Sequence, residues 1–214
     1  MEPFLERIHL PLKTPLHEPG VNVETLYLPV DCVISVVMVL RDGTQIEVLT
    51  VGREGLTGAQ ALLDGGASAS LSVCQIAGDA YSVSFETFKR LLEQFSPLRD
   101  LVERYLSAQL DVMAQSIACN RRHHVSQRTA RWLLMTHDRV GRTDVPITHE
   151  VLATMLGVRR AGVSIAAATL QDAGFINYSR GRFAIVNRPG LIGAACECYN
   201  AINEAFVRRR LPQP

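Results

Sequence analysis

Two adjacent arginines, Arg159 and Arg160, stand near the start of the stretch LGVRRAGVSIAAATLQDAGFI, which runs from Leu156 to Ile176. A guanidinium group is planar, always charged and carries five donors, so it suits paired hydrogen bonds to phosphate oxygens or to a base edge. The apolar residues that follow have helical spacing. We therefore expect a helix whose first turn can contact a polyanion.

This helix is expected to have two faces. Apolar residues at i, i+3, i+4 and i+7 predict a packing face, which consists of Val163, Ala166, Ala167 and Leu170. The same geometry turns Ala161, Ile165 and Ala168 outward. These three offer only apolar contacts, for which a thymine methyl group is the natural target. The alternative is that another protein surface covers this outward face.

A second short helix is expected directly before the arginines. Thr148 can cap HEVLATML, and Gly157 can end it in the left-handed conformation. Two short helices joined by a tight glycine turn form a helix-turn-helix, whose second helix lies in the major groove of DNA. We therefore expect Arg160 to read a base, Arg159 to hold a phosphate, and Ser164 to contact a phosphate or an adenine edge.

More arginines flank this unit on both sides. After Gly174, the stretch FINYSRGRFAIV alternates around a turn, which predicts a two-stranded wing with Arg180 and Arg182 at its tip. Both are placed to contact DNA phosphates. Earlier in the chain, the expected roles are non-specific phosphate contacts or salt bridges between subunits for Arg121, Arg122 and Arg128.

A long helix must connect this unit to the N-terminal part of the chain. Ser96 and Pro97 are typical of a helix start, and no breaker follows for more than twenty residues. Its apolar residues recur every three or four positions; they are Leu98, Leu101, Val102, Tyr105, Leu106, Leu110, Met113 and Ile117. The commonest partner for such a stripe is its own copy, which predicts a homodimer. The alternative is packing onto the preceding unit, mainly by the first two turns.

The preceding part, from about residue 14 to residue 84, is typical of antiparallel strands. The Asp42-Gly43 pair lies between two runs rich in β-branched residues and predicts a hairpin. A glycine-rich insertion, VGREGLTGAQALLDGGASAS, precedes the next strand and contains a short helical segment. An insertion of this kind between strands often holds a ligand.

Composition and charge separate the two parts. Residues 1–114 carry a net charge of −7 and residues 115–214 carry +8, within a chain of 214 residues whose net charge is +1. Every basic residue after residue 114 is an arginine. An acidic half joined to a basic half indicates a regulatory part and a polyanion-binding part, unless the charges only solvate two surfaces.

The sequence also bounds the compartment. The longest apolar run, CVISVVMVL, has nine residues, about half of the roughly 18 that a membrane-spanning helix needs. A signal peptide has a basic region followed by an apolar stretch, and the N-terminus MEPFLERIHL lacks this pattern. Five cysteines are an odd number and fit reduced thiols. We expect a cytoplasmic protein without a membrane partner.

The order of these parts resembles the Crp/Fnr family of transcription regulators. The most specific match is the stretch from Leu156 to Ile176, supported by LYLPVDCVISV and VLTVGREGLTG. The resemblance implies an α+β fold: an antiparallel β-roll (a double-stranded β-helix of the cupin-like, jelly-roll kind), a long dimerisation helix and a winged helix-turn-helix. The expected domains are a cyclic-nucleotide-binding-like sensor at 1–95, the dimerisation helix at 96–120 and the DNA-binding domain at 121–214.

The resemblance also implies an effector pocket in the β-roll. Its candidate residues are Arg53, Glu54, Gly55, Leu56, Ser68 and Ser70. Family members that bind cyclic AMP hold its phosphate with an arginine later in this loop, but no arginine lies between Ala59 and Val73. A buried phosphate without that contact loses about 1.5 to 3 kcal/mol. We therefore expect no tight binding of cyclic AMP.

No metal site, cofactor or enzymatic activity is expected. Cys119 with His123 and His124, or Cys196 with Cys198, could ligate a metal, but neither set is joined to a second one at the spacing that zinc sites favour. We expect buried thiols instead, with the Cys-Glu-Cys segment on a helix from Gly190 to Arg210. The motifs of serine hydrolases, phosphate-binding loops, zinc proteases and dinucleotide-binding folds are absent from the sequence.

These features predict a homodimeric, sequence-specific DNA-binding transcription regulator that senses an effector. The expected partners are double-stranded DNA, a second copy of the chain, RNA polymerase and a small-molecule effector that the sequence does not identify. The alternative is a protein-interaction or small-ligand-sensing module whose winged helix no longer binds DNA. Retention on DNA with a steep salt dependence distinguishes the two.

Overall fold

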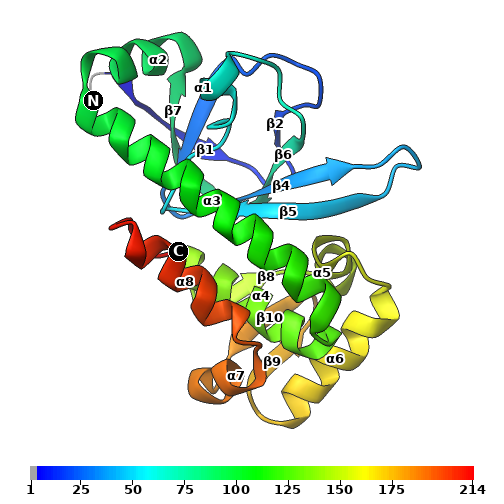
Figure 1. The fold of residues 1–214 in the computed structure, drawn as a ribbon. Coiled ribbons are helices and arrows are strands. Elements are labelled where there is room, and N and C mark those ends of the chain that lie inside the picture. Colours follow the sequence, from blue (N-terminus) through cyan, green and yellow to red (C-terminus); the bar gives the residue numbers. More distant parts are fainter. Residues whose placement is uncertain (1–3) are drawn as a thin grey trace.

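The structure is a computed structural model that describes residues 4–214. Figure 1 shows a unit of β-strands above, a mainly helical unit below, and one long helix that runs along both. The expected α+β fold, with a β-roll, a long helix and a winged helix-turn-helix, is confirmed.

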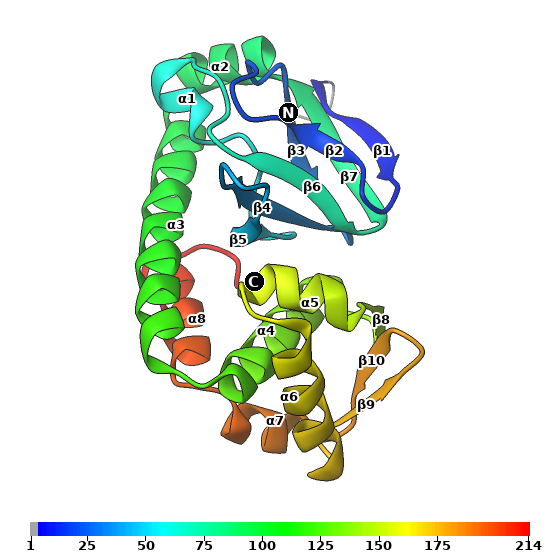
Figure 2. The same ribbon diagram turned by 90° about the vertical axis from the view of Figure 1, so that its right-hand side faces the viewer.

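The N-terminal unit is a roll of two antiparallel sheets (Figure 2). Their strands are β1 (Glu6–Leu10), β2 (Pro15–His17), β3 (Thr25–Pro29), β4 (Val33–Val39), β5 (Gln45–Val51), β6 (Leu71–Ile76) and β7 (Gly78–Ser84). One sheet has the strand order β1-β7-β3 and the other β2-β6-β4-β5. The predicted hairpin is confirmed: β4 pairs with β5, and the backbone N–H of Thr44 donates to the Asp42 carboxylate over 2.9 Å.

Three helices belong to the next part of the chain: one lies in the glycine-rich segment, and two come after the last strand of the roll. They are α1 (Ala61–Asp64), α2 (Phe85–Gln94) and α3 (Ser96–Arg122). The Ser84 side chain caps α2 by accepting from the backbone N–H of Thr87. Helix α3 has 27 residues, with Pro97 in its first turn. It therefore spans both units without a break, as Figure 2 shows.

The predicted apolar stripe of α3 divides between two surroundings. Val102 and Tyr105 are buried, in agreement with the alternative that the first turns pack on the β-roll. Leu110 and Ile117 are 67% and 68% exposed. One face of α3 thus belongs to the core, and a second apolar face has no partner among the described residues.

The C-terminal unit consists of α4 (Val125–Val140), β8 (Asp144–Pro146), α5 (His149–Leu156), α6 (Arg160–Asp172), β9 (Ile176–Ser179), β10 (Arg182–Ile185), α7 (Arg188–Ala194) and α8 (Cys198–Arg208). The wing differs from the prediction in one respect. It has three strands in the order β8-β10-β9, because β8, which lies before the helix-turn-helix, pairs with β10.

The prediction of one continuous helix from Gly190 to Arg210 is wrong, because two helices, α7 and α8, occupy this segment. The chain leaves α7 at Ala195, whose backbone is extended, and starts α8 at Cys198. A continuous helix would turn residues i and i+2 to different faces. The break instead lets Cys196 and Cys198 both point inward, where they are 4% and 1% exposed.

No single helix of residues 4–214 is long and apolar enough to cross a membrane. Helices α5 and α6 reach the required length and apolarity only when taken together, across a bend of 109°.

A buried ion pair joins the β-roll to the C-terminal unit. The Arg139 guanidinium on α4 donates from Nε to Glu54 Oε1 over 2.9 Å, and its Nη2 lies 2.9 Å from the same oxygen. Both side chains are 1% exposed. Nearby, Trp132 Nε1 on α4 donates to Glu47 Oε2 on β5 over 2.8 Å. Polar contacts inside the core therefore hold the two units together.

We expect Arg139→Met to lower the free energy of unfolding by about 3–5 kcal/mol, because it leaves the Glu54 carboxylate buried and unpaired. Urea unfolding, followed by circular dichroism and Trp132 fluorescence, measures this change. The matched control is Arg53→Met, at an exposed residue next to Glu54, where a change within about 0.5 kcal/mol is expected. Equal effects of the two substitutions would show that the ion pair does not stabilise the fold.

Candidate functional site

The helix-turn-helix is built by the local signals that the sequence contains. The Thr148 hydroxyl accepts from the backbone N–H of Val151 and caps α5. Gly157 ends α5 at φ +63°, a left-handed conformation that side chains rarely adopt. Its N–H returns to the carbonyls of Ala153 and Thr154. The chain then turns into α6, so the two helices meet at 109°.

Helix α6 has the two faces that its spacing predicts. The packing face is buried against the rest of the unit and consists of Val163, Ala166, Ala167 and Leu170. The outward residues Ala161, Ile165 and Ala168 are exposed, Ile165 to 70%. The outward row of α6 is therefore apolar from Ala161 to Ala168, and exposed polar residues follow only at its C-terminal end, at Thr169, Gln171 and Asp172.

The cationic side chains of α6 lie at its N-terminal end. Arg159 and Arg160 are exposed, and Arg160 Nε lies 3.8 Å from Glu150 Oε2 on α5. Because both side chains of this pair are largely exposed, the pair is weak and leaves Arg160 free to bind another anion. Ser164 is more constrained, since its Oγ lies 3.0 Å from His149 Nδ1 and donates to the Arg160 carbonyl over 3.1 Å.

His149 is a residue of this region that the sequence did not single out. Its ring stacks on Tyr178 of the wing with ring centroids 4.3 Å apart, and it contacts Ser164 of α6. Partial burial, and then the charge of Arg160, lower the pKa of His149 below its usual 6.5. The neutral imidazole thus connects α5, α6 and the wing at neutral pH. Nothing in its sequence neighbourhood indicates these contacts.

The wing presents its two arginines differently. Arg182 Nε donates to Asp144 Oδ2 on β8 over 2.6 Å. Arg180 is exposed at the turn with φ +50°, followed by Gly181 at φ +72°. Among the described residues, none of the recorded ion pairs or side-chain hydrogen bonds involves the Arg180 guanidinium. Arg180 is therefore the free cation at the wing tip.

The arginines near the end of α3 also separate. Arg121 and Arg122 are exposed. Arg128 is buried on α4, and its Nη2 donates to the Leu156 carbonyl at the end of α5. The expectation that Arg128 contacts phosphate or a second subunit is therefore wrong in this structure, because its guanidinium supports the helix-turn-helix from inside.

The tip of the β4-β5 hairpin lies beside the start of α6. Gly43, Thr44 and Gln45 line one side of an open hollow, and Arg159 and Arg160 line the other. A Cβ atom added at Gly157 would lie 3.4 Å from Ile46 Cγ2 of β5, so the turn of the helix-turn-helix packs closely on this hairpin. The β-roll thus contacts the unit that carries the exposed arginines.

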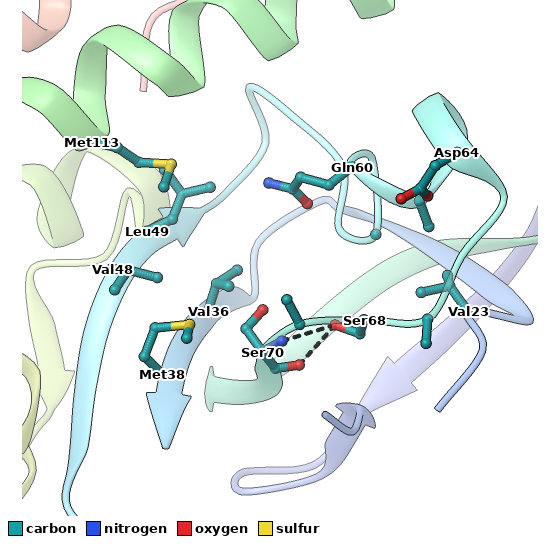
Figure 3. Close-up of a pocket in the computed structure, with 14 residues that line it drawn as sticks. Val23, Val36, Met38, Val48, Leu49, Gln60, Asp64, Ser68, Ser70 and Met113 are labelled. Atoms are coloured by element: carbon teal, nitrogen blue, oxygen red, sulfur yellow. Dashed lines mark hydrogen bonds between the residues drawn. The ribbon is translucent and has the colours of Figure 1, made fainter. Parts of the chain in front are cut away.

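A pocket of about 240 Å³ lies inside the β-roll (Figure 3). Its lining is mostly apolar: Val23, Val36, Met38, Val48, Leu49, Gly58, Ala61, Ala67, Ala69 and Met113, with Gln60, Asp64, Ser68 and Ser70 as polar members. The Ser68 hydroxyl donates to the Ser70 carbonyl over 2.7 Å. Met113 comes from α3, so the long helix forms part of the wall.

Two of the predicted effector residues, Ser68 and Ser70, line this pocket. The other four do not. Arg53 is exposed, and Glu54 pairs with Arg139. Gly55 and Leu56 pack against Tyr105 of α3, whose hydroxyl donates to the Leu56 carbonyl over 3.3 Å. The pocket is lined by no arginine, lysine or histidine.

Comparison with known proteins tests the resemblance. Residues 127–193 match the model of the Crp-like helix-turn-helix domain. No curated protein matches the chain. Among solved structures, FixK2 from Bradyrhizobium japonicum is similar with a TM-score of 0.77 and 14% identity, covering 90% of this chain and 98% of its own.

Two further solved structures have the same arrangement. TTHB099, a CRP-family transcriptional regulator from Thermus thermophilus, has a TM-score of 0.71 and 24% identity, covering 90% of this chain and 99% of its own. The c-di-GMP-responsive regulator CLP from Xanthomonas campestris has a TM-score of 0.68 and 16% identity, covering 86% and 94%. The chain therefore carries a Crp-like helix-turn-helix domain on the fold of the Crp/Fnr transcription regulators.

Proposed function

We propose that the chain is a homodimeric, sequence-specific DNA-binding regulator that responds to an apolar effector. The observation that carries the DNA-binding part is the exposed N-terminal end of α6, where Arg159 and Arg160 lie free of strong ion pairs. In a helix-turn-helix this end of the second helix enters the major groove. Arg160 reads a base edge and Arg159 holds a phosphate.

The remaining contacts follow from the exposed surface of the same unit. Ala161, Ile165 and Ala168 meet thymine methyl groups in the groove. Ser164 is held by His149, so it supports the first turn of α6 and reaches DNA only through its remaining hydrogen-bonding capacity. Arg180 and, once it leaves Asp144, Arg182 contact the backbone from the wing.

In the proposed dimer, the second copy of the chain packs against α3. Leu110 and Ile117 are exposed, and Leu106 and Met113, which are partly buried, continue the same row at spacings of three and four residues. This row matches the seam of two helices packed along their length. Pairing α3 with its copy buries these side chains and places two α6 helices on one face of the dimer.

The proposed effector site is the pocket of the β-roll. It is apolar except for Ser68, Ser70, Gln60 and Asp64. The negative charge of the Asp64 carboxylate would repel a phosphate group in this pocket. Gln60 Nε2 donates to Gln109 Oε1 of α3 over 3.1 Å, and Met113 lies on the wall. An effector in this pocket therefore contacts the helix that forms the dimer, and α3 carries its effect to the DNA-binding unit.

We expect selection from random duplexes to yield an operator of two half-sites about one helical turn apart. Arg160→Ala should weaken DNA binding by about 1–3 kcal/mol of binding free energy and relax the preference at one base position. Arg159→Ala should weaken the binding of all DNA sequences to the same extent. Arg90→Ala, at an exposed arginine of α2, is the matched control. Full affinity of Arg160→Ala for the same half-site would refute its role. Failure to enrich any sequence would favour a protein-interaction module.

We expect the purified chain to sediment at twice 23.6 kDa, and the double substitution Leu110→Glu and Ile117→Glu to give a monomer. The introduced charges would be buried against each other in the paired helices, which is costly. Sedimentation equilibrium measures the masses. The control is Leu63→Glu, at a residue of α1 that is 73% exposed, which should remain a dimer. A dimer of the α3 variant would exclude this face as the contact.

We expect no binding of cyclic AMP in isothermal titration calorimetry at micromolar concentrations. Among the residues that line the pocket none is a cation, and the lost charge-assisted contact alone weakens binding by about tenfold to a hundredfold. The same titration of the Asp64→Ala variant tests the pocket without the negative charge on its wall. A micromolar dissociation constant for the unmodified chain would contradict this prediction.

A further inference from the structure

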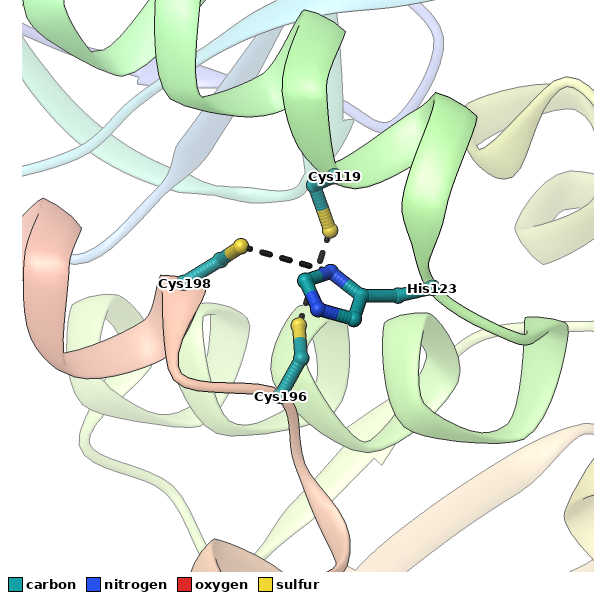
Figure 4. Close-up of side chains that lie close together, drawn as sticks. All are labelled: Cys119, His123, Cys196 and Cys198. Atoms are coloured by element: carbon teal, nitrogen blue, oxygen red, sulfur yellow. Dashed lines mark hydrogen bonds between the residues drawn. The ribbon is translucent and has the colours of Figure 1, made fainter.

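Four potential metal ligands meet where the end of α3 faces the break between α7 and α8 (Figure 4). Cys119 and His123 lie one turn apart at the C-terminal end of α3, and Cys196 and Cys198 flank Glu197 in the connection to α8. Their ligand atoms all lie within 4.8 Å of one another. The proposed regulatory function uses none of these side chains.

In the sequence these residues form two separate sets, since 77 positions separate Cys119 from Cys196. The fold joins the two sets at one point. We propose that Cys119, His123, Cys196 and Cys198 bind one zinc ion. Three thiolates and one imidazole are a ligand set found in structural zinc sites, where the ion is tetrahedral and closed to solvent.

The separations between ligand atoms suit a single tetrahedral ion. Cys119 Sγ lies 3.5 Å from Cys196 Sγ, and Cys198 Sγ lies 3.5 Å from His123 Nδ1. A tetrahedron with Zn–S bonds of about 2.3 Å has sulfur atoms about 3.8 Å apart. These two separations are within a few tenths of an ångström of that spacing, and no two of the four ligand atoms are more than 4.8 Å apart.

The site is closed, as a structural zinc site requires. Cys119, Cys196 and Cys198 are 0%, 4% and 1% exposed, and the His123 side chain is 13% exposed. Four protein ligands leave no open position for water or substrate. The proposed ion thus has a structural role and no catalytic one.

Neighbouring groups orient the ligands as outer partners of a metal do. His123 Nε2 lies 3.1 Å from Glu197 Oε2, so the carboxylate can accept the proton of the nitrogen that does not face the thiols. This arrangement fixes Nδ1 as the ligand atom, as carboxylate–histidine–zinc groups do. Gln115 Nε2 also donates to Cys198 Sγ over 3.0 Å.

Two buried arginines supply the charge balance. Arg128 and Arg131 are 7% and 6% exposed, and both act electrostatically on Cys119 and Cys196. Within residues 4–214 neither forms an ion pair with a carboxylate, and the Nε atom of each is buried without a hydrogen-bond partner. Three thiolates around Zn²⁺ carry a net charge of −1, so one of the two guanidinium groups is enough to neutralise the buried site.

The position of the ion indicates what it does. It would join the last turn of α3 to the start of α8, and α8 already packs on α3 through Arg209 Nη1, which lies 2.8 Å from Asp111 Oδ2. His123 is also the residue at which α3 ends before α4 begins. The ion therefore fixes how the helix-turn-helix unit is attached to the long helix.

The first test measures metal in the purified full-length chain, prepared with a reductant and without added metal. Inductively coupled plasma mass spectrometry should find about one zinc ion per chain. Cys119→Ser and Cys196→Ser should each lower that content at least tenfold, and Cys74→Ser should leave it unchanged, since Cys74 is an equally buried thiol of the β-roll. Metal retained by both ligand variants, or iron in place of zinc, would overturn the assignment.

The second test needs no variant and so does not depend on how the substituted chains fold. Cobalt added to the reduced, chelator-treated chain should give the intense visible bands and thiolate charge-transfer absorption of a tetrahedral sulfur site, and zinc should displace it. X-ray absorption of the zinc form should show three sulfur neighbours at about 2.3 Å and one nitrogen at about 2.0 Å. Failure of the reduced chain to bind either ion would refute the proposal.

Discussion

The arrangement of the two units depends on one buried ion pair. A charge inside a protein is costly unless it is paired, and neither Glu54 nor Arg139 has an alternative ionic partner among the described residues. The two residues are 85 positions apart and come from different units. The backbone also adapts to the pair: a Cβ atom at Gly52 would lie 2.6 Å from Arg139 Cγ. A shift of the units that broke the pair while either charge stayed buried would be costly, so the pair favours one docked arrangement over partly displaced ones.

Helix α3 extends the same coupling along the whole molecule. Its first half packs on the β-roll through Tyr105 and forms part of the pocket through Met113. Its last turn contributes Cys119 to the cluster beside α8. The helix is continuous over 27 residues, so no break separates the part on the β-roll from the last turn. The proposed effector site, dimer seam and zinc site therefore lie on one rigid element.

Features that depend on local sequence could be predicted, and features that depend on distant residues could not. The hairpin at Asp42, the cap at Thr148 and the turn at Gly157 were expected correctly, because each is determined by a few neighbouring residues. The family resemblance predicts that Glu54 lies in the pocket, but its partner Arg139 belongs to another unit. The cysteine sets were separated for the same reason. Their proximity arises from the packing of α8 on α3, which no short sequence pattern encodes.

The two arginines at the start of α6 lie where the β-roll and the proposed DNA surface meet. The hairpin residues Gly43 to Gln45 share one hollow with Arg159 and Arg160. The hairpin tip therefore lies beside the first turn of α6, and beyond that turn the outward residues up to Ala168 are alanine and isoleucine. Because both arginines of the proposed reading helix lie in this one turn, a small shift of the β-roll against α5 and α6 would change access to them. In the proposed function, a recognition surface this narrow would let a small movement of the β-roll control DNA binding.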